Sequence, residues 1–289
     1  MGDGLSRALW ERYEPVHDLI YFAPEARQTA DGLGMRGFWM GYFALRAAPL
    51  GAVPASVVTG SFYVFHPDRV TRALPDAWRY AVPADVLAAR QQAMDAAMTR
   101  LFGTDAVGSP EMAEAADLAW EAAMAADTAG RVLAAANQAV DRPEQPHVRL
   151  WQALTTLREH RGDGHFAVLV CHGLGPVEAM VLKAAAGEGD DRMLRETRAW
   201  DVPAWQEAAA GLRERGWLGR DGALTPAGAA GRAAVEAQTD AAAERPWAAL
   251  GADRTARLAT LLEPLARTVR DSGLLPSGNP VGLPRTSDR

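Results

Sequence analysis

The stretch WQEAAAGLRERGWLGRDGALTPAGAAGRAAVEAQTD, residues 205–240, decides how the second half of the chain folds. A helical period through Trp205, Ala209 and Leu212 is followed by two short apolar runs on either side of a turn at residues 220–222. Thr225-Pro226 then places a helix N-cap residue before a proline that suits the first helical turn. The stretch therefore predicts a helix, a tight two-stranded ribbon and a second, long helix.

That order of elements is typical of a winged helix-turn-helix. We expect an almost all-α chain with an N-terminal helical domain over residues 1–142 and a winged helix-turn-helix domain over residues 143–274. Its short two-stranded wing is expected near Trp217–Leu218 and Ala223–Leu224. Residues 275–289 read as a Pro/Gly-rich tail. The helix expected over residues 226–243 is long enough for a homodimer contact or for a strut between domains.

Three other segments give specific structural expectations. Residues 38–48 are apolar almost all round, which predicts a buried helix. Residues 54–65 have strand propensity, but their proline start and their helical neighbours favour a buried helix. The helix that begins at His147 is expected to break at residues 161–164, where two glycines flank Asp163.

Composition and length describe an ordinary globular protein with room for two domains. The 289 residues are 48% hydrophobic and 23% charged. The single cysteine, Cys171, cannot form an internal disulfide, which agrees with a reducing cytoplasm. No run of about 18 apolar residues predicts a membrane span, and the first residues do not have the pattern of a secretory signal. We therefore expect a cytoplasmic protein with no membrane partner.

Residues 164–270 resemble the winged-helix domain of MarR-like regulators. The resemblance is carried by Leu212 with Gly216-Trp217-Leu218, by Leu224-Thr225-Pro226 with Gly228, and by Asp240. The whole chain is also similar to an actinobacterial family labelled helix-turn-helix, through the motifs HDLIYFAPEA, GYFALRAAPLG, FYVFHPDRV and RALPDAW. These resemblances imply a regulator ancestry and a winged-helix fold.

The charge of the chain disfavours DNA as a partner. The net charge is −6, and residues 163–232 hold eight basic and ten acidic side chains. The helix in the recognition position opens at Asp201 and carries Glu207, where a DNA reader presents basic or small polar side chains. Because affinity for DNA comes mainly from several phosphate contacts, we expect weak binding at best. A sequence-specific transcriptional regulator remains an alternative.

The candidate catalytic residues lie in the N-terminal half. His17 and Tyr21 share a helix face, Glu25 follows one short turn later, and His66 follows an aromatic segment. Such a set can move protons on a bound ligand or hold a metal or haem. The spacing matches no metal motif, so we predict no metal, with His17 and His66 as the candidate ligands if one binds. The structural alternative makes His17 a core residue, Glu25 a helix N-terminal charge and His66 a helix cap.

The aromatic residues of the same half predict a ligand pocket. Its expected lining is Trp39, Tyr42, Phe43, Phe62 and Tyr63. One of several nearby arginines could hold an anionic ligand: Arg27, Arg36, Arg46, Arg69 or Arg72. Our leading interpretation is a small-molecule-binding protein of regulator ancestry with no assigned cofactor. The alternatives are an enzyme of specialised metabolism that reuses the scaffold, and a structural partner protein.

Overall fold

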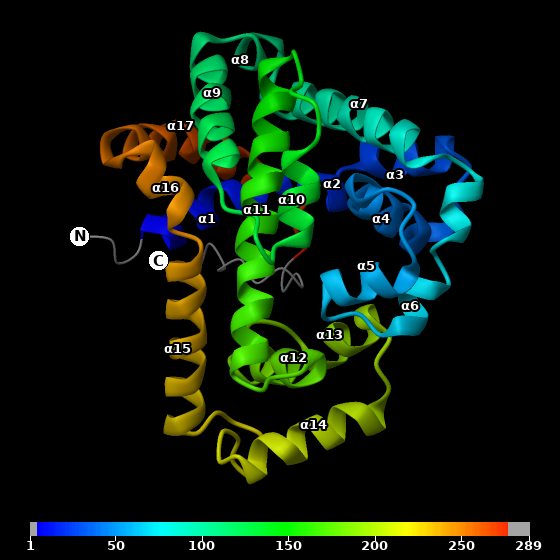
Figure 1. Cartoon of the computed structure of the whole chain (residues 1–289), viewed down its shortest axis with the longest axis vertical. Helices are drawn as coiled ribbons and strands as arrows, with labels where there is room; N and C mark the ends of the chain where they lie inside the picture. The colour runs from blue at the N-terminus through cyan, green and yellow to red at the C-terminus, as the bar shows by residue number, and fades with distance from the viewer. Residues whose placement is uncertain (1–4, 277–289) are drawn as a thin grey trace.

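The computed structural model describes residues 5–276, which are mostly helical (Figure 1). The elements of the N-terminal half are α1 (Leu5–His17), α2 (Leu19–Phe22), α3 (Pro24–Gly32), α4 (Gly37–Ala47), η1 (Ala48–Leu50), α5 (Ala55–Phe62), α6 (Pro67–Thr71), η2 (Asp76–Arg79), α7 (Pro83–Phe102), α8 (Thr104–Val107), α9 (Pro110–Ala125) and α10 (Val132–Gln138). Those that follow are α11 (Pro146–Cys171), α12 (Pro176–Ala185), α13 (Asp191–Arg198), α14 (Val202–Glu214), α15 (Pro226–Ala242), α16 (Arg245–Leu250) and α17 (Ala252–Asp271).

Two hydrophobic cores hold these helices together, and α11 contributes to both. The larger core joins α1, α3, α4, α7 and α9 to the first half of α11, around residues such as Trp151, and also takes in α16 and α17. The smaller core joins Leu169 near the end of α11 to Leu212 of α14 and Val235 of α15. The long helix α11 therefore runs from one core into the other, which Figure 1 shows as the central green rod.

The predicted break in this central helix is wrong, because α11 continues through residues 161–164. The Asp163 carboxylate accepts a hydrogen bond from the backbone N–H of Ala134 at 2.9 Å, which ties α11 to α10. A side chain at Gly164 would collide with the guanidinium of Arg131. A helical glycine costs about 1 kcal/mol relative to alanine, and close packing of neighbouring elements offsets that cost here.

The expectation of a helix over residues 54–65 is confirmed by α5, but its predicted burial is wrong, because only Val58 and Phe62 of this helix are buried and Val57 is exposed. Helix α4 forms as expected, but it is not buried all round. Phe38 is 48% exposed, and Trp39 and Tyr42 are partly buried, whereas Phe43 is fully buried. One face of α4 thus packs in the core, and the other carries partly exposed aromatic rings.

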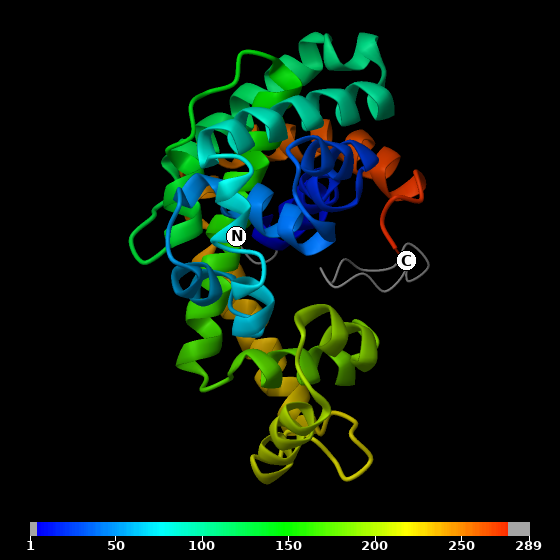
Figure 2. The same ribbon diagram turned by 90° about the vertical axis from the view of Figure 1, so that its right-hand side faces the viewer.

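The C-terminal half contains a helix-turn-helix formed by α13 and α14. Helix α13 is capped by the Asp190 carboxylate, which accepts from the N–H of Met193, and it is terminated by Ala199 in the left-handed conformation (φ 64°). Asp201 then caps α14 by accepting from the N–H of Ala204 at 2.9 Å. Both helices pack against α12. Figures 1 and 2 place this helix-turn-helix at the end of the molecule opposite α8 and α9.

The predicted two-stranded wing is wrong. Residues 5–276 contain no regular β-strand, and the loop between α14 and α15 holds a single antiparallel bridge between Leu218 and Leu224. Backbone hydrogen bonds join Gly219 to Ala223 and Thr225 to Trp217, but the pairing cannot extend further, because Thr225 already caps α15 by accepting from the N–H of Gly228 at 3.0 Å. Trp217 packs so closely on α15 that a side chain at Gly231 would collide with its ring. The domain is therefore a helix-turn-helix with a tight loop in place of a wing.

Within the described part of the chain, no single helix combines the length and apolar character needed to cross a membrane. Two bent helix pairs reach that length and composition only when each pair is counted together, Gly37–Leu50 with Ala55–Phe62 and Pro146–Cys171 with Pro176–Ala185.

Candidate functional site

Two adjoining cavities lie between the N-terminal aromatic helices and the helices around the helix-turn-helix. We call the larger one, of about 460 Å³, the aromatic chamber, and the smaller one, of about 270 Å³, the polar chamber. The residues that line both are Arg158, His165, Phe166, Leu169, Ala179 and Lys183. The larger volume is in the range of small-molecule sites.

Aromatic side chains from α2, α4, α5 and the segment after α5 form one side of the aromatic chamber. They are Tyr21, Phe22, Phe38, Trp39, Tyr42, Phe62 and Phe65. The ring of Phe65 lies 5.9 Å from that of Trp39 and 5.6 Å from that of Tyr42, measured between centroids. These spacings are those of favourable aromatic pairs, so the wall is a packed cluster of rings.

Positive charge gathers in the lining of the same chamber, next to the aromatic rings. Its lining includes Arg46, Arg158, Lys183 and Arg198, and no Asp or Glu is found among the described residues that line it. His165 adds no charge near neutral pH, because burial lowers its pKa to about 4. An apolar chamber with cations and no lining carboxylate favours an anionic occupant.

Two of these cations are held by carboxylates behind the chamber wall. Arg46 donates to Glu159 from Nε to Oε1 at 3.0 Å and from Nη2 to Oε2 at 3.1 Å. Arg158 donates to Glu159 at 3.1 Å and to Glu14 at 3.2 Å. Burial alone would raise the pKa of Glu159, but the charges of Arg46 and Arg158 outweigh it and hold the pKa at about 2. Glu159 is therefore a permanent anion that fixes both guanidinium groups.

Arg198 differs from the other two arginines because no carboxylate in residues 5–276 forms an ion pair with it. Its guanidinium lies 4.5 Å above the ring centroid of Phe65, and it donates to the hydroxyl of Thr197 at 3.3 Å. Burial lowers the pKa of Arg198, and the nearby positive charges of Arg46 and Arg158 lower it further. An anion in the chamber would supply the charge that this guanidinium lacks.

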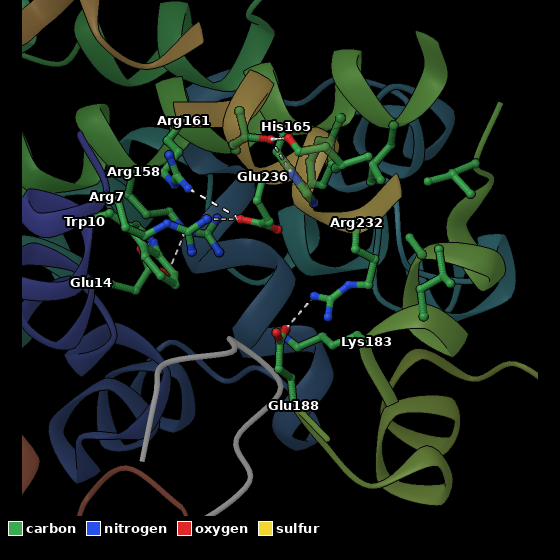
Figure 3. A pocket seen from close by; sticks show the side chains of 18 residues that line it. Arg7, Trp10, Glu14, Arg158, Arg161, His165, Lys183, Glu188, Arg232 and Glu236 are labelled. Carbon is green, nitrogen blue, oxygen red and sulfur yellow. Dashed lines mark hydrogen bonds and ion pairs between the residues drawn. The ribbon is translucent and has the colours of Figure 1, made fainter. Parts of the chain in front are cut away.

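Lys183 is the only lysine of the chain and lines both chambers. Burial lowers its pKa to about 8, and the positive charge of Arg198 contributes to this shift. In Figure 3 the side chain of Lys183 extends past the ion pair between Glu188 and Arg232, whose closest atoms are 2.9 Å apart. The ammonium group is therefore charged near neutral pH and titrates just above it.

The polar chamber has a different electrostatic character, because its charges are paired within it (Figure 3). Glu236 forms ion pairs with Arg7 and, at 3.8 Å, with Arg161. His165 makes a hydrogen bond from Nδ1 to the hydroxyl of Thr239 at 2.9 Å. Because its charges compensate one another, the polar chamber favours a charged ligand less than the aromatic chamber does.

The structure places four of the predicted pocket or catalytic residues at the aromatic chamber, namely Tyr21, Trp39, Tyr42 and Phe62. Phe43 is fully buried behind them and is 5.0 Å from Phe65 between ring centroids. The ring of Tyr63 stacks on Phe166, and its hydroxyl donates to the carbonyl of Leu174.

The four candidate catalytic residues are not gathered in one place. His17 is buried behind Tyr21, and the two are joined by a 3.0 Å hydrogen bond between Nε2 and the phenolic hydroxyl. His66 caps α6 by accepting from the N–H of Asp68 at 3.1 Å. The Glu25 carboxylate pairs with Arg100. Neither His66 nor Glu25 lines the aromatic chamber.

No group of three or more His, Cys, Asp or Glu side chains in residues 5–276 is placed to hold a metal ion. The cations that dominate the chamber were largely missed by sequence reasoning. Arg46 appeared among the candidate anion-binding arginines, but Arg158 and Arg198 come from distant segments that no local pattern connects. The one available signal was the uniqueness of Lys183 in an arginine-rich chain.

Comparison with known proteins identifies a family. A model of a helix-turn-helix family matches residues 6–276, whereas curated proteins and solved structures give no match. The helix-turn-helix formed by α13 and α14 agrees with the description of that family. Because the match extends over almost the whole chain, the protein belongs to this helix-turn-helix family.

Proposed function

We propose that the protein binds a small organic anion with an aromatic or otherwise apolar body in the aromatic chamber. The body would lie against Trp39, Tyr42 and Phe65, where each Å² of apolar surface removed from water contributes about 25 cal/mol. The charged group would face Arg198 and Lys183. The proposal rests on one observation, the partly buried guanidinium of Arg198, which has no carboxylate partner in the described chain.

The charges around the chamber favour a ligand whose anionic group lies at Arg198. A cation held away from water is unfavourable unless an opposite charge accompanies it. Arg46 and Arg158 already have that charge in Glu159 and Glu14, so an incoming anion gains most at Arg198. A neutral apolar ligand would fill the chamber but leave Arg198 uncompensated.

The location of the chamber supports a link between ligand and helix-turn-helix. Arg198 is the last residue of α13, directly before the turn to α14. Its carbonyl accepts from the N–H of His66 at 2.9 Å, and Trp200 Nε1 donates to the carbonyl of Val64 at 2.9 Å. We propose that a bound anion braces this contact between the two halves, as suits a ligand-binding protein of MarR-like regulator ancestry.

Two fluorescent probes of nearly equal shape test the proposal. One is 8-anilino-1-naphthalenesulfonate, which is anionic, and the other is N-phenyl-1-naphthylamine, which is its neutral counterpart. We expect the anion to bind with one-to-one stoichiometry and at least tenfold more tightly than the neutral probe, the ratio that about 1.4 kcal/mol provides.

The variant Arg198→Met removes the uncompensated charge and should erase this preference. Arg192→Met is the matched control, since Arg192 lies on the same helix, is exposed and pairs with Glu196. It makes the same change in net charge and should leave the preference intact. Equal affinity of the native protein for both probes, or equal effects of the two substitutions, would refute the proposal.

A further inference from the structure

The hydrogen bonds behind Tyr21 determine what its hydroxyl can offer a ligand. The imidazole of His17 lies between two hydroxyl groups, with Nδ1 3.0 Å from Thr155 Oγ1 and Nε2 3.0 Å from the Tyr21 oxygen. Thr155 also donates its own proton to the carbonyl of Trp151 at 2.9 Å. The three side chains therefore form a chain of hydrogen bonds from α11 to the wall of the aromatic chamber.

One arrangement of protons satisfies this chain completely. If Thr155 donates to Trp151, its oxygen must accept from His17 Nδ1–H, because a hydroxyl has only one proton. His17 Nε2 is then an acceptor, and the Tyr21 hydroxyl donates to it. The other tautomer would turn the Tyr21 proton away from His17, where no described residue of the chain accepts it. The first arrangement thus makes one more hydrogen bond.

Nearby charges favour the same arrangement. Burial lowers the pKa of His17 well below its ordinary value, with a further contribution from Arg158, so the ring is neutral and one nitrogen is free to accept. The positive charges of Arg158 and Arg46 also act on the phenol of Tyr21. A guanidinium only donates hydrogen bonds, so neither arginine can accept the Tyr21 proton, and His17 Nε2 remains its acceptor.

From this geometry we infer that Tyr21 meets the ligand only as a hydrogen-bond acceptor, so the ligand carries a hydroxyl or N–H donor in addition to its anionic group. The inference deepens the proposed function and depends on it. Tyr21 would determine specificity, and His17 and Thr155 would act through it as positioning residues. Aromatic hydroxy acids and amino acids of suitable size belong to the inferred class, and their methyl ethers do not.

A series of naphthoates tests the inference. The probes are 5-, 6- and 7-hydroxy-2-naphthoate, each compared with its methyl ether by fluorescence titration. For at least one position the hydroxy compound should bind about threefold to tenfold more tightly, as expected for one added hydrogen bond. In Tyr21→Phe that ratio should fall to about one.

The variant Thr155→Val separates this mechanism from a purely structural role. It removes the acceptor of the buried Nδ1–H, so the ring proton should move to Nε2, where it can donate to the Tyr21 oxygen. The Tyr21 hydroxyl should then turn its own proton toward the chamber, where water can accept it. The methyl ether should then become the preferred partner of the pair. Thr156→Val is the matched control, because Thr156 is also buried and donates to the Gln152 carbonyl. It should keep the native preference.

Nitrogen-15 NMR of the ligand-free protein with labelled histidine measures the tautomer of His17. We expect the proton on Nδ1 in the native protein and on Nε2 in Thr155→Val. A native Nε2 proton, or a hydroxy preference that survives Thr155→Val, would overturn the inference. If no naphthoate binds, the proposed function fails and the inferred ligand class with it, whereas the ring proton is still observed directly.

Discussion

The Glu159 carboxylate holds the Arg46 guanidinium by two hydrogen bonds of 3.0 and 3.1 Å, with both side chains almost completely buried. The same carboxylate accepts from Arg158 at 3.1 Å. One anion thus compensates two arginines at the wall of the aromatic chamber. Removal of the Glu159 carboxylate alone is strongly destabilising, because it leaves the buried positive charge of the arginines without compensation.

Glu159→Gln should therefore destabilise the protein by about 3–5 kcal/mol, the usual loss when one partner of a buried ion pair is removed. Urea unfolding followed by circular dichroism measures this change. Glu121→Gln is the comparison, because Glu121 forms a two-point pair with Arg254 in which both side chains are about half exposed. Solvent screens that pair, so little change is expected. Similar losses in both variants would contradict the importance assigned to Glu159.

Binding of the anionic probe should weaken as the pH rises through about 8. Burial, together with the charge of Arg198, holds the pKa of Lys183 at about 8, so Lys183 is charged at pH 7 and neutral at pH 9. Loss of one charge–anion contact should reduce affinity by about tenfold. Titrations of 8-anilino-1-naphthalenesulfonate between pH 6.5 and 9.5 measure this, with the neutral probe as a control that should not vary.

Lys183→Met should bind the anion weakly and without this pH dependence. The native protein should also gain stability between pH 8 and about 10.4, because the folded pKa of Lys183 lies below its ordinary value and the unfolded chain binds more protons there. If Lys183→Met kept the native pH profile, another group would be responsible.

Local signals were sufficient to predict most helices. Thr225 before Pro226 predicts a helix start from two neighbouring residues, and Thr225 caps α15 as expected. The wing and the break in α11 failed because tertiary packing decided them. Trp217 packs on α15, and close neighbours occupy the space beside Gly164. A single sequence does not show such contacts.

The candidate site, too, was predictable only where local sequence signals exist. Aromatic residues such as Trp39 and Tyr42 stand close together in the sequence, so a pattern suggested them as pocket residues. Arg198 reaches the chamber from a segment more than a hundred residues away. Its importance depends on the absence of a carboxylate partner in the described fold, which composition and spacing do not reveal.

His66→Ala should weaken the fold without changing probe binding. The His66 imidazole caps α6 and meets the ring of Trp200 edge-on, 4.7 Å between centroids, but it does not line the chamber. We expect a loss of about 1 kcal/mol, typical of a helix cap, and an unchanged affinity for 8-anilino-1-naphthalenesulfonate. Glu25→Gln should likewise leave affinity unchanged. A tenfold loss of affinity with native stability would place His66 in the site.

DNA binding should be weak and non-specific, because the exposed face of α14 offers little net positive charge. Gln206, Glu207, Arg213, Glu214 and Arg215 are exposed there. Arg215 donates to the carbonyl of His172 at 2.8 Å and lies 4.0 Å above the ring centroid of Trp217, so it is already engaged. Few side chains remain for phosphate contacts, which supply most affinity for DNA.

Mobility-shift titrations at about 100 mM salt, with random and promoter-derived duplexes, measure this affinity. Exchanging Glu207 and Glu214 for arginine should strengthen binding to every duplex alike, because the added charges contact phosphates and not bases. Glu11→Arg with Glu263→Arg, away from α14, makes the same change in charge and should have less effect. A specific native complex in the nanomolar range typical of regulators would show that α14 reads DNA despite its acidic residues.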